Sequence, residues 1–284
     1  MYFQFNTTTE IHPEERTWAA ILLLLISLAG GAVNAYIASG FMFGILFRGG
    51  FFIFSISKSF SNILTCSLVF FWLVPAVFIK ENLVSNYVNM ILSQLLLFGL
   101  YIQGNLTQCF LSLNRFATIC FVGSVKRKNS DLVALGVFTS WFSAVIWTLL
   151  GYPECTCYFS SESLTFRYAD DCHVSNYQLQ LYCAFVLMMI SNMLNVISFL
   201  IICCGGACML QSILFIIDVF LISSLNSGSF GDILVALPSM AFLALVDGLI
   251  MLICNNDIQP ACIASRNLQK KSSVISISAS DFRM

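Results

Sequence analysis

Long apolar blocks, separated by short polar segments, make up most of the chain. Most are at least as long as the roughly 20 residues that an α-helix needs to cross a bilayer. The blocks cover residues 18–43, 55–79, 87–113, 132–150, 177–202, 209–225 and 233–253. The sixth is at the short limit for a span, so six is the nearest alternative count. Backbone groups must be paired internally in lipid. The pattern therefore predicts an all-α, polytopic membrane protein, a bundle of seven transmembrane helices.

The composition agrees with this prediction. Hydrophobic residues make up 58% of the 284 residues, charged residues only 10%, and the mean hydropathy is +0.87. A soluble domain has about a quarter of its residues charged. The net charge of -1 gives no argument for nucleic acid as a partner. The lipid bilayer is the partner that the composition predicts.

Lysine and arginine predict the orientation, because they accumulate on the cytoplasmic side of a membrane. With the N-terminus outside, Arg16, Lys80 and Arg167 are outside. The other 10 of the 13 basic residues, Lys58 and Arg115 among them, are then inside or near that face. This predicts an extracellular N-terminus (1–17), a seven-transmembrane domain (18–253) and a cytoplasmic tail (254–284). The opening segment has no basic region typical of a cleaved signal peptide.

The third block carries polar residues at helical spacing. They are Gln94, Tyr101, Asn105, Gln108, Ser112 and Arg115, separated by 7, 4, 3, 4 and 3 positions. Such spacing puts all of them on one face of a continuous helix. In a membrane that face turns toward the protein interior. Interhelical hydrogen bonding is the alternative for Asn105 and Gln108. For Arg115 the alternative is snorkelling to lipid headgroups.

The end of this block, "LNRFATICF", resembles the D/E-R-Y element at the inner end of the third helix of G-protein-coupled receptors. More closely, the chain resembles the nematode serpentine chemoreceptors, particularly class X. "FSISKSFSNILTCSLVFFWLVP" in the second block and "LVDGLIMLICNNDIQ" in the seventh carry the same resemblance. It covers residues from about 33 to 259 and depends on the order and spacing of short motifs.

The resemblance implies a rhodopsin-like fold and a chemosensory receptor in the plasma membrane, with sensory cilia as its implied place in the cell. A small-molecule or peptide ligand would bind in a pocket open to the outside, for which Gln94, Phe98 and Tyr101 are the candidates. A heterotrimeric G protein would be the partner inside. Asn114, Arg115 and Phe116 would carry coupling and activation, although the amide of Asn114 replaces the family's carboxylate and forms a weaker hydrogen bond.

Three polar residues in different blocks are expected at a similar depth in the membrane. Counted at the rise of an α-helix, Asn34, Asn62 and Asp247 all fall in the inner half of the bundle. An intramembrane aspartate is a functional candidate by default. We therefore expect a buried polar network of these three residues; a purely structural hydrogen bond is the alternative.

The segment before the fifth block, "GYPECTCYFSSESLTFRYADDCHVSNYQ", contains three cysteines. Outside the cell two of them should be oxidised. The expected disulfide joins Cys172 to Cys155 or to Cys157 and closes the loop into a lid. Asn6-Thr7-Thr8 matches a glycosylation acceptor, with chance in a threonine-rich tail as the alternative.

Other functions have weaker support. Asp218 and Asp247 lie in successive late blocks, as in intramembrane aspartyl proteases, but without the sequence context of those enzymes. The two histidines, His12 and His173, fall in outer segments, so no metal or other cofactor is expected. A transporter would show internal repeats or matching helix-breaking prolines, which the chain lacks. We expect a receptor, not an enzyme.

Two departures from the receptor pattern favour a non-coupling or truncated relative as the alternative. Little more than "CCGGAC" joins the fifth and sixth blocks, where a receptor normally contacts its G protein. The seventh block has "LPSMAFLALVDGL" in place of the N-P-x-x-Y element of the larger receptor family.

Overall fold

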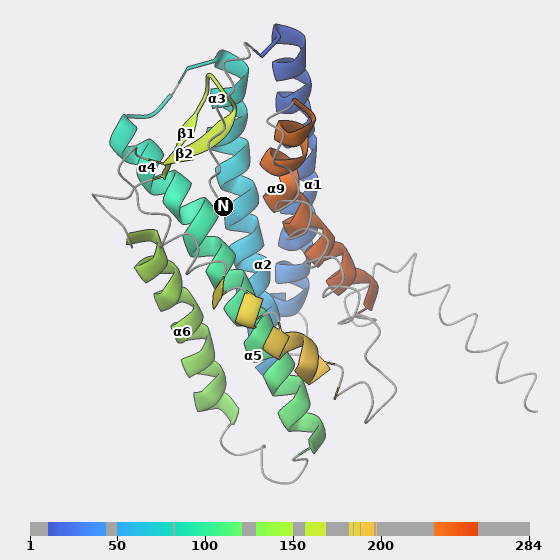
Figure 1. Ribbon diagram of the computed structural model, residues 1–284. Coiled ribbons are helices and arrows are strands. Elements are labelled where there is room, and N and C mark those ends of the chain that lie inside the picture. Colours follow the sequence, from blue (N-terminus) through green and yellow to red (C-terminus); the bar gives the residue numbers. More distant parts are fainter. Residues whose placement is uncertain are drawn as a thin grey trace, which may run out of the picture.

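The computed structural model describes residues 11–43, 50–81, 83–120, 129–149, 157–168, parts of 182–197, and 230–254 (Figure 1). Its helices are α1 (Pro13–Phe43), α2 (Gly50–Leu68), α3 (Val74–Ile79), α4 (Asn86–Gln94), α5 (Leu100–Cys120), α6 (Asn129–Leu149) and α9 (Phe230–Cys254). Two π-helical turns, η1 (Val69–Leu73) and η2 (Leu95–Gly99), join α2 to α3 and α4 to α5. An antiparallel hairpin of β1 (Cys157–Ser160) and β2 (Thr165–Tyr168) completes the described elements.

The helices match the predicted spans with longer ends. Within the described part of the chain, four helices are long and apolar enough to cross a membrane: Pro13–Met42, Gly50–Ile79, Asn86–Ala117 and Asp131–Leu149. Shorter apolar helices, Phe185–Asn195 and Ala241–Leu252, fall in the predicted fifth and seventh spans, whereas the sixth lies outside the described residues. The first helix begins five residues before the predicted boundary, since Pro13 suits a first helical turn and Glu14 and Glu15 favour its positive end.

The side chains are distributed as a membrane protein requires. Serine, asparagine and glutamine side chains are buried between the helices, while large apolar side chains are exposed. On α6 the exposed residues recur at intervals of three or four: Leu132, Leu135, Phe138, Phe142, Val145 and Leu149. This spacing is one face of a helix, and lipid is the medium in which such a face is stable.

The π-helical turn η1 has a local cause. In it the Val74 N–H donates to the carbonyl of Val69, five residues back. Pro75 follows at once; it has no N–H, and in a regular α-helix its ring would collide with the carbonyl four residues back. The wider turn accommodates the proline without ending the span.

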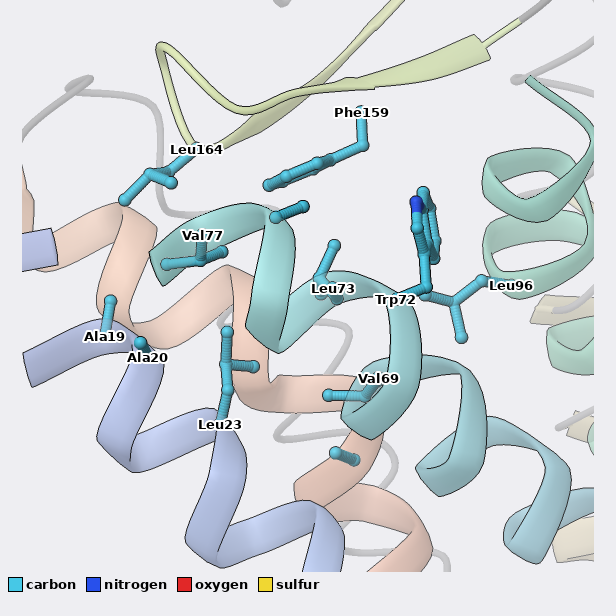
Figure 2. Packing of buried hydrophobic residues seen from close by; sticks show 12 residues of the cluster. Ala19, Ala20, Leu23, Val69, Trp72, Leu73, Val77, Leu96, Phe159 and Leu164 are labelled. Atoms are coloured by element: carbon cyan, nitrogen blue, oxygen red, sulfur yellow. The ribbon is translucent and has the colours of Figure 1, made fainter. Parts of the chain in front are cut away.

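The helices pack as a bundle with two distinct ends. α1, α2 and α9 all contact one another, α2 also contacts α5, and α5 contacts α6 (Figure 1). At the end that we call the hairpin end, Phe159 and Leu164 of the hairpin pack among Ala19, Val77 and Leu73 (Figure 2). At the opposite end, which we call the Arg115 end, separate clusters contain Phe41 with Met251 and Phe54 with Leu111.

Candidate functional site

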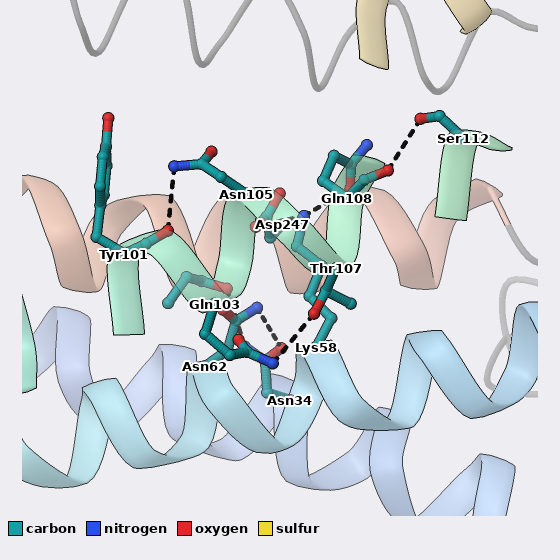
Figure 3. A network of polar contacts seen from close by, with 11 residues as sticks. Asn34, Lys58, Asn62, Tyr101, Gln103, Asn105, Thr107, Gln108, Ser112 and Asp247 are labelled. Atoms are coloured by element: carbon teal, nitrogen blue, oxygen red, sulfur yellow. Dashed lines mark hydrogen bonds and ion pairs between the residues drawn. The ribbon is translucent and has the colours of Figure 1, made fainter. Parts of the chain in front are cut away.

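Asn34 of α1 is the centre of the expected polar network and is completely buried (Figure 3). Its Nδ2 donates to the carbonyl of Gly30 at 2.9 Å and to the carbonyl of Ala244 on α9 at 2.9 Å. Its Oδ1 accepts from Asn62 Nδ2 of α2 at 3.1 Å. One amide therefore joins three helices, because both of its ends are hydrogen-bonded to different neighbours.

Gly248 allows the close approach of α1 and α9 at this point. A Cβ at position 248 would lie 2.9 Å from Asn34 Nδ2 and 2.9 Å from Val33 Cγ1. Real Cβ atoms do not come that close, so any larger residue would push the two helices apart. This is the small-residue packing typical of helix contacts in membranes.

The third expected member, Asp247, forms an ion pair with a residue that the sequence analysis did not include in the network. Its Oδ2 lies 3.0 Å from Lys58 Nζ of α2. Lys58 also donates to Gln108 Oε1 of α5 at 2.8 Å. The charge count treated Lys58 only as a signal of orientation, whereas the residue is buried between three helices. A signal was present: Lys58 is four residues before Asn62 and so shares its helix face.

The polar network therefore contacts α9 at two neighbouring positions. Asn34 contacts the main chain at Ala244, and Lys58 contacts the side chain at Asp247, about one turn further on. Charges that are buried in a bundle are stable only when paired and hydrogen-bonded. Lys58 and Asp247 satisfy this condition for each other.

The polar face of the third helix is shorter than its spacing predicts. Tyr101, Asn105, Gln108 and Ser112 lie along one side of α5 (Figure 3). Asn105 donates to the Tyr101 carbonyl at 3.0 Å, and the Ser112 hydroxyl is 2.8 Å from that of Ser191. Through Ser191 the polar face of α5 contacts the segment predicted as the fifth span.

Gln94 does not continue this face, because η2 separates it from Tyr101. In η2 the Leu100 N–H donates to the Leu95 carbonyl, five residues back. The extra residue in that turn rotates the preceding helix by about 100° relative to α5. Of the pocket candidates, Gln94 and Phe98 are buried and Tyr101 is half-buried. The structure therefore does not gather the three on one helix face.

A second polar face of α5 was missed by sequence reasoning. Gln103 and Thr107 are both completely buried and are joined by a hydrogen bond of 3.1 Å. Gln103 also approaches Ser57 Oγ of α2 at 3.5 Å, and Trp141 Nε1 of α6 donates to the same hydroxyl at 3.0 Å. The four-residue spacing of Gln103 and Thr107 was the available signal.

The Asn114, Arg115 and Phe116 element lies where α5 meets the first turn of α2. A Cβ at Gly50 would be 2.9 Å from Asn114 Oδ1, so the amide packs directly against that glycine. The Arg115 guanidinium carbon lies 4.9 Å from the centre of the Phe51 ring, and Arg115 Nη1 is buried. Arg115 is half-buried and packs over an aromatic face in a cation–π arrangement. Phe116 is half-buried.

The hairpin covers the opposite end of the bundle. Arg16 is buried, and its guanidinium donates to the carbonyls of Val77 at 3.2 Å, Ser161 at 2.6 Å and Glu162 at 3.0 Å. Asn89 of α4 donates to the Phe159 carbonyl at 2.9 Å and accepts from the Phe159 N–H at 3.4 Å. Two residues from different helices therefore hold the hairpin. The sequence predicted a lid here but not its strands.

The remaining sequence-predicted sites are only partly described. Cys157 is buried in β1, and this burial raises the pKa of its thiol. Cys155, Cys172 and Asn6 lie outside the described residues, as do Asp218 and the "CCGGAC" connection. Within the described ranges, no group of three or more His, Cys, Asp or Glu side chains could hold a metal ion.

The fold is similar to that of a solved seven-helix membrane protein. The crystal structure of squid rhodopsin superposes with a TM-score of 0.67, at 11% sequence identity, over 91% of this chain and 87% of that chain. This similarity confirms the expected seven-helix fold. No curated protein matches the sequence.

The family is identified by sequence. Residues 24–205, more than half of the chain, match the family described as serpentine type 7TM GPCR chemoreceptor Srx. The chain belongs to this family, as its motifs predict. It is therefore a G-protein-coupled-receptor-type protein with several membrane-spanning helices.

Proposed function

We propose that the chain is a chemosensory receptor of the plasma membrane that binds a small-molecule or peptide cue outside and activates a heterotrimeric G protein inside. The observation that carries this proposal is the position of Arg115. It ends the polar face of α5 beside the first turn of α2, with its guanidinium over Phe51 and its Nη1 buried. An arginine that served only as a topology signal would gain nothing from that burial.

The proposed orientation puts the hairpin end outside and the Arg115 end in the cytoplasm. The charge distribution supports it, even with Lys58 removed from the count. Arg16, Lys80 and Arg167 belong to the hairpin end, whereas Arg115 precedes the basic run Lys126, Arg127, Lys128. Epitope tags at the two termini, stained on intact and on permeabilised cells, test this orientation. Both tags on one side would exclude an odd number of spans and with it the receptor proposal.

Arg115→Lys tests coupling. Lysine keeps the charge, and so the topology, but lacks the planar guanidinium that stacks on Phe51 and forms several hydrogen bonds at once. Membranes containing the chain and one class of Gα subunit at a time are assayed for GTPγS binding, without ligand and with a library of neutral organic molecules. We expect at least one combination to respond, and a fall of about tenfold in Arg115→Lys at equal surface level.

The matched control is Arg167→Lys, because Arg167 is an exposed arginine at the hairpin end. It should leave exchange unchanged. If Arg115→Lys and Arg115→Ala both respond like the parent, Arg115 has no role in coupling.

A non-coupling relative is the second candidate, and one observation favours it. The residue that packs on Gly50 is Asn114, whose neutral amide cannot form an ion pair with Arg115. Asn114→Asp supplies the carboxylate. Exchange that appears only in chimeras carrying the longer fifth-to-sixth connection of another family member would establish this second candidate.

A further inference from the structure

Two kinds of contact hold α9 in the bundle at neighbouring levels, one to α1 and one to α2, and they differ in how readily they break. At Ala244 the contact is to the main chain, and Gly248 packs against Asn34 with no room for a Cβ. This contact changes only if the helices separate or the buried Asn34 amide shifts. At Asp247 the contact is between the ends of two side chains, Lys58 and Asp247, at 3.0 Å.

Lys58 has a second acceptor on a different helix. Its ammonium carries three donors and donates to Gln108 Oε1 at 2.8 Å while it contacts Asp247. If Asp247 moves away, Lys58 still has a hydrogen-bond acceptor on α5. The usual obstacle to opening a buried ion pair, an ammonium left without a partner, is therefore reduced.

The aspartate is the more accessible partner. Its side chain retains 14% of its exposure against 6% for Lys58, so the carboxylate is the group that another polar molecule or water reaches first. Gln108 also belongs to the polar face of Tyr101, Asn105 and Ser112 on α5 (Figure 3). Gln108 therefore joins Lys58 to this polar face of α5.

We propose that the Lys58–Asp247 pair is a latch that holds α9 in its resting position, and that Gln108 is the acceptor that keeps Lys58 hydrogen-bonded when the latch opens. Asn34 and Gly248 form the pivot that remains closed. The proposal rests on the proposed receptor function for its consequence, a change in nucleotide exchange. The second position of α9 that it predicts does not depend on a G protein.

The test uses the full chain in lipid nanodiscs with one spin label on α2 and one on α9. Suitable positions are Ile53 and Leu249, whose side chains are both exposed. The labels are attached to genetically encoded amino acids, since the 12 cysteines would react with thiol reagents. The variant is Lys58→Met/Asp247→Asn, which removes both charges together and so leaves neither one buried alone. The control is Lys80→Met, which removes an exposed lysine at the end of α3.

The parent and Lys80→Met should give one narrow distance distribution, and the double variant a second population. The double variant should also raise ligand-free GTPγS binding by about fivefold or more, the range of ordinary coupling energies. If it does not reach the membrane, Lys58→Gln/Asp247→Asn, which keeps hydrogen-bonding groups at both positions, is measured in its place.

The two proposals fail in different ways. A single distribution identical to the parent's in the neutral variant overturns the latch, whatever the G protein does. A second distance population with no change in exchange for any Gα class supports the latch and contradicts the proposed coupling.

Discussion

Arg16 donates to the carbonyl oxygen of Ser161 at 2.6 Å, across 145 positions of sequence, and thereby joins the first turns of α1 to the turn of the β-hairpin. The same guanidinium also donates to Val77 and Glu162. Its acceptors in these contacts are main-chain carbonyls, so the contact depends on backbone position and not on a carboxylate. A planar group with five donors in a fixed arrangement is suited to this role.

Arg16→Lys should loosen the hairpin. Lysine has a single nitrogen and cannot reach carbonyls from three residues in this geometry. We expect a loss of about 2 kcal/mol, because hydrogen bonds from charged donors contribute about 1.5–3 kcal/mol each and lysine would retain some of them. Thermal unfolding in detergent micelles measures the loss. Arg167→Lys is the control, and equal melting temperatures for both variants would contradict the role of Arg16.

Asn89→Asp should destabilise the same hairpin by a different route. The carboxylate cannot donate to the Phe159 carbonyl, which the amide approaches at 2.9 Å, and would place a negative oxygen against it. Leaving a buried acceptor unpaired costs about 1–3 kcal/mol. Thermal unfolding in detergent micelles measures the loss. Asn86→Asp, an exposed position in the first turn of α4, is the matched control and should be neutral or slightly stabilising.

Gly248→Ala should weaken the contact between α1 and α9. The added methyl group would meet Asn34 and Val33 at 2.9 Å, so the helices must separate or the Asn34 hydrogen bonds must shift. Overpacking of this kind costs about 1–3 kcal/mol. Gly104→Ala is the control, since a Cβ there meets nothing within 4 Å. A melting temperature that is lower for Gly104→Ala than for Gly248→Ala would contradict this prediction.

Phe51→Leu tests the contact of Arg115 without touching the arginine. It removes an aromatic face 4.9 Å from the guanidinium and keeps an apolar side chain of similar reach. Cation–π contacts contribute about 0.5–2 kcal/mol, or roughly a 2- to 30-fold change in any equilibrium that the contact controls. We expect altered ligand-free GTPγS binding at unchanged surface level. Phe78→Leu, an exposed phenylalanine of α3, should have no effect; identical exchange in both variants would mean that Phe51 only packs.

The outer disulfide remains a prediction, and the burial of Cys157 decides how to test it. Its buried position and raised thiol pKa keep this sulfur unreactive toward alkylating reagents even when reduced. Alkylation of native membranes therefore cannot distinguish a bonded from a reduced Cys157. Peptide mapping after denaturation without reduction can. We expect Cys172 linked to Cys155 or Cys157, and three separately alkylated peptides would refute the bridge.

The amino-acid sequence by itself determined that this protein lies in a lipid bilayer, and it determined much of the helical architecture. Blocks of apolar residues long enough to span a bilayer predict helices, because lipid leaves the backbone no other partners. Local spacing was also sufficient to single out Asn34 and Asn62, which the structure brings within 3.1 Å of each other. These features depend on composition and helical period, which are properties of short stretches of sequence.

Only the tertiary structure decided how the helices are joined. Spacing put Gln94 on the face of Tyr101, but one π-helical turn changes the phase of the helix between them. Charge counting put Lys58 near a membrane surface, yet it pairs with Asp247 nearly two hundred positions away. Arg16 was counted only as a charge outside the membrane, and its side chain is buried under the hairpin. For Lys58 and Arg16 the deciding energy is a contact between residues far apart in the chain. Periodicity within one helix contains no information about which side chain of another helix will lie opposite.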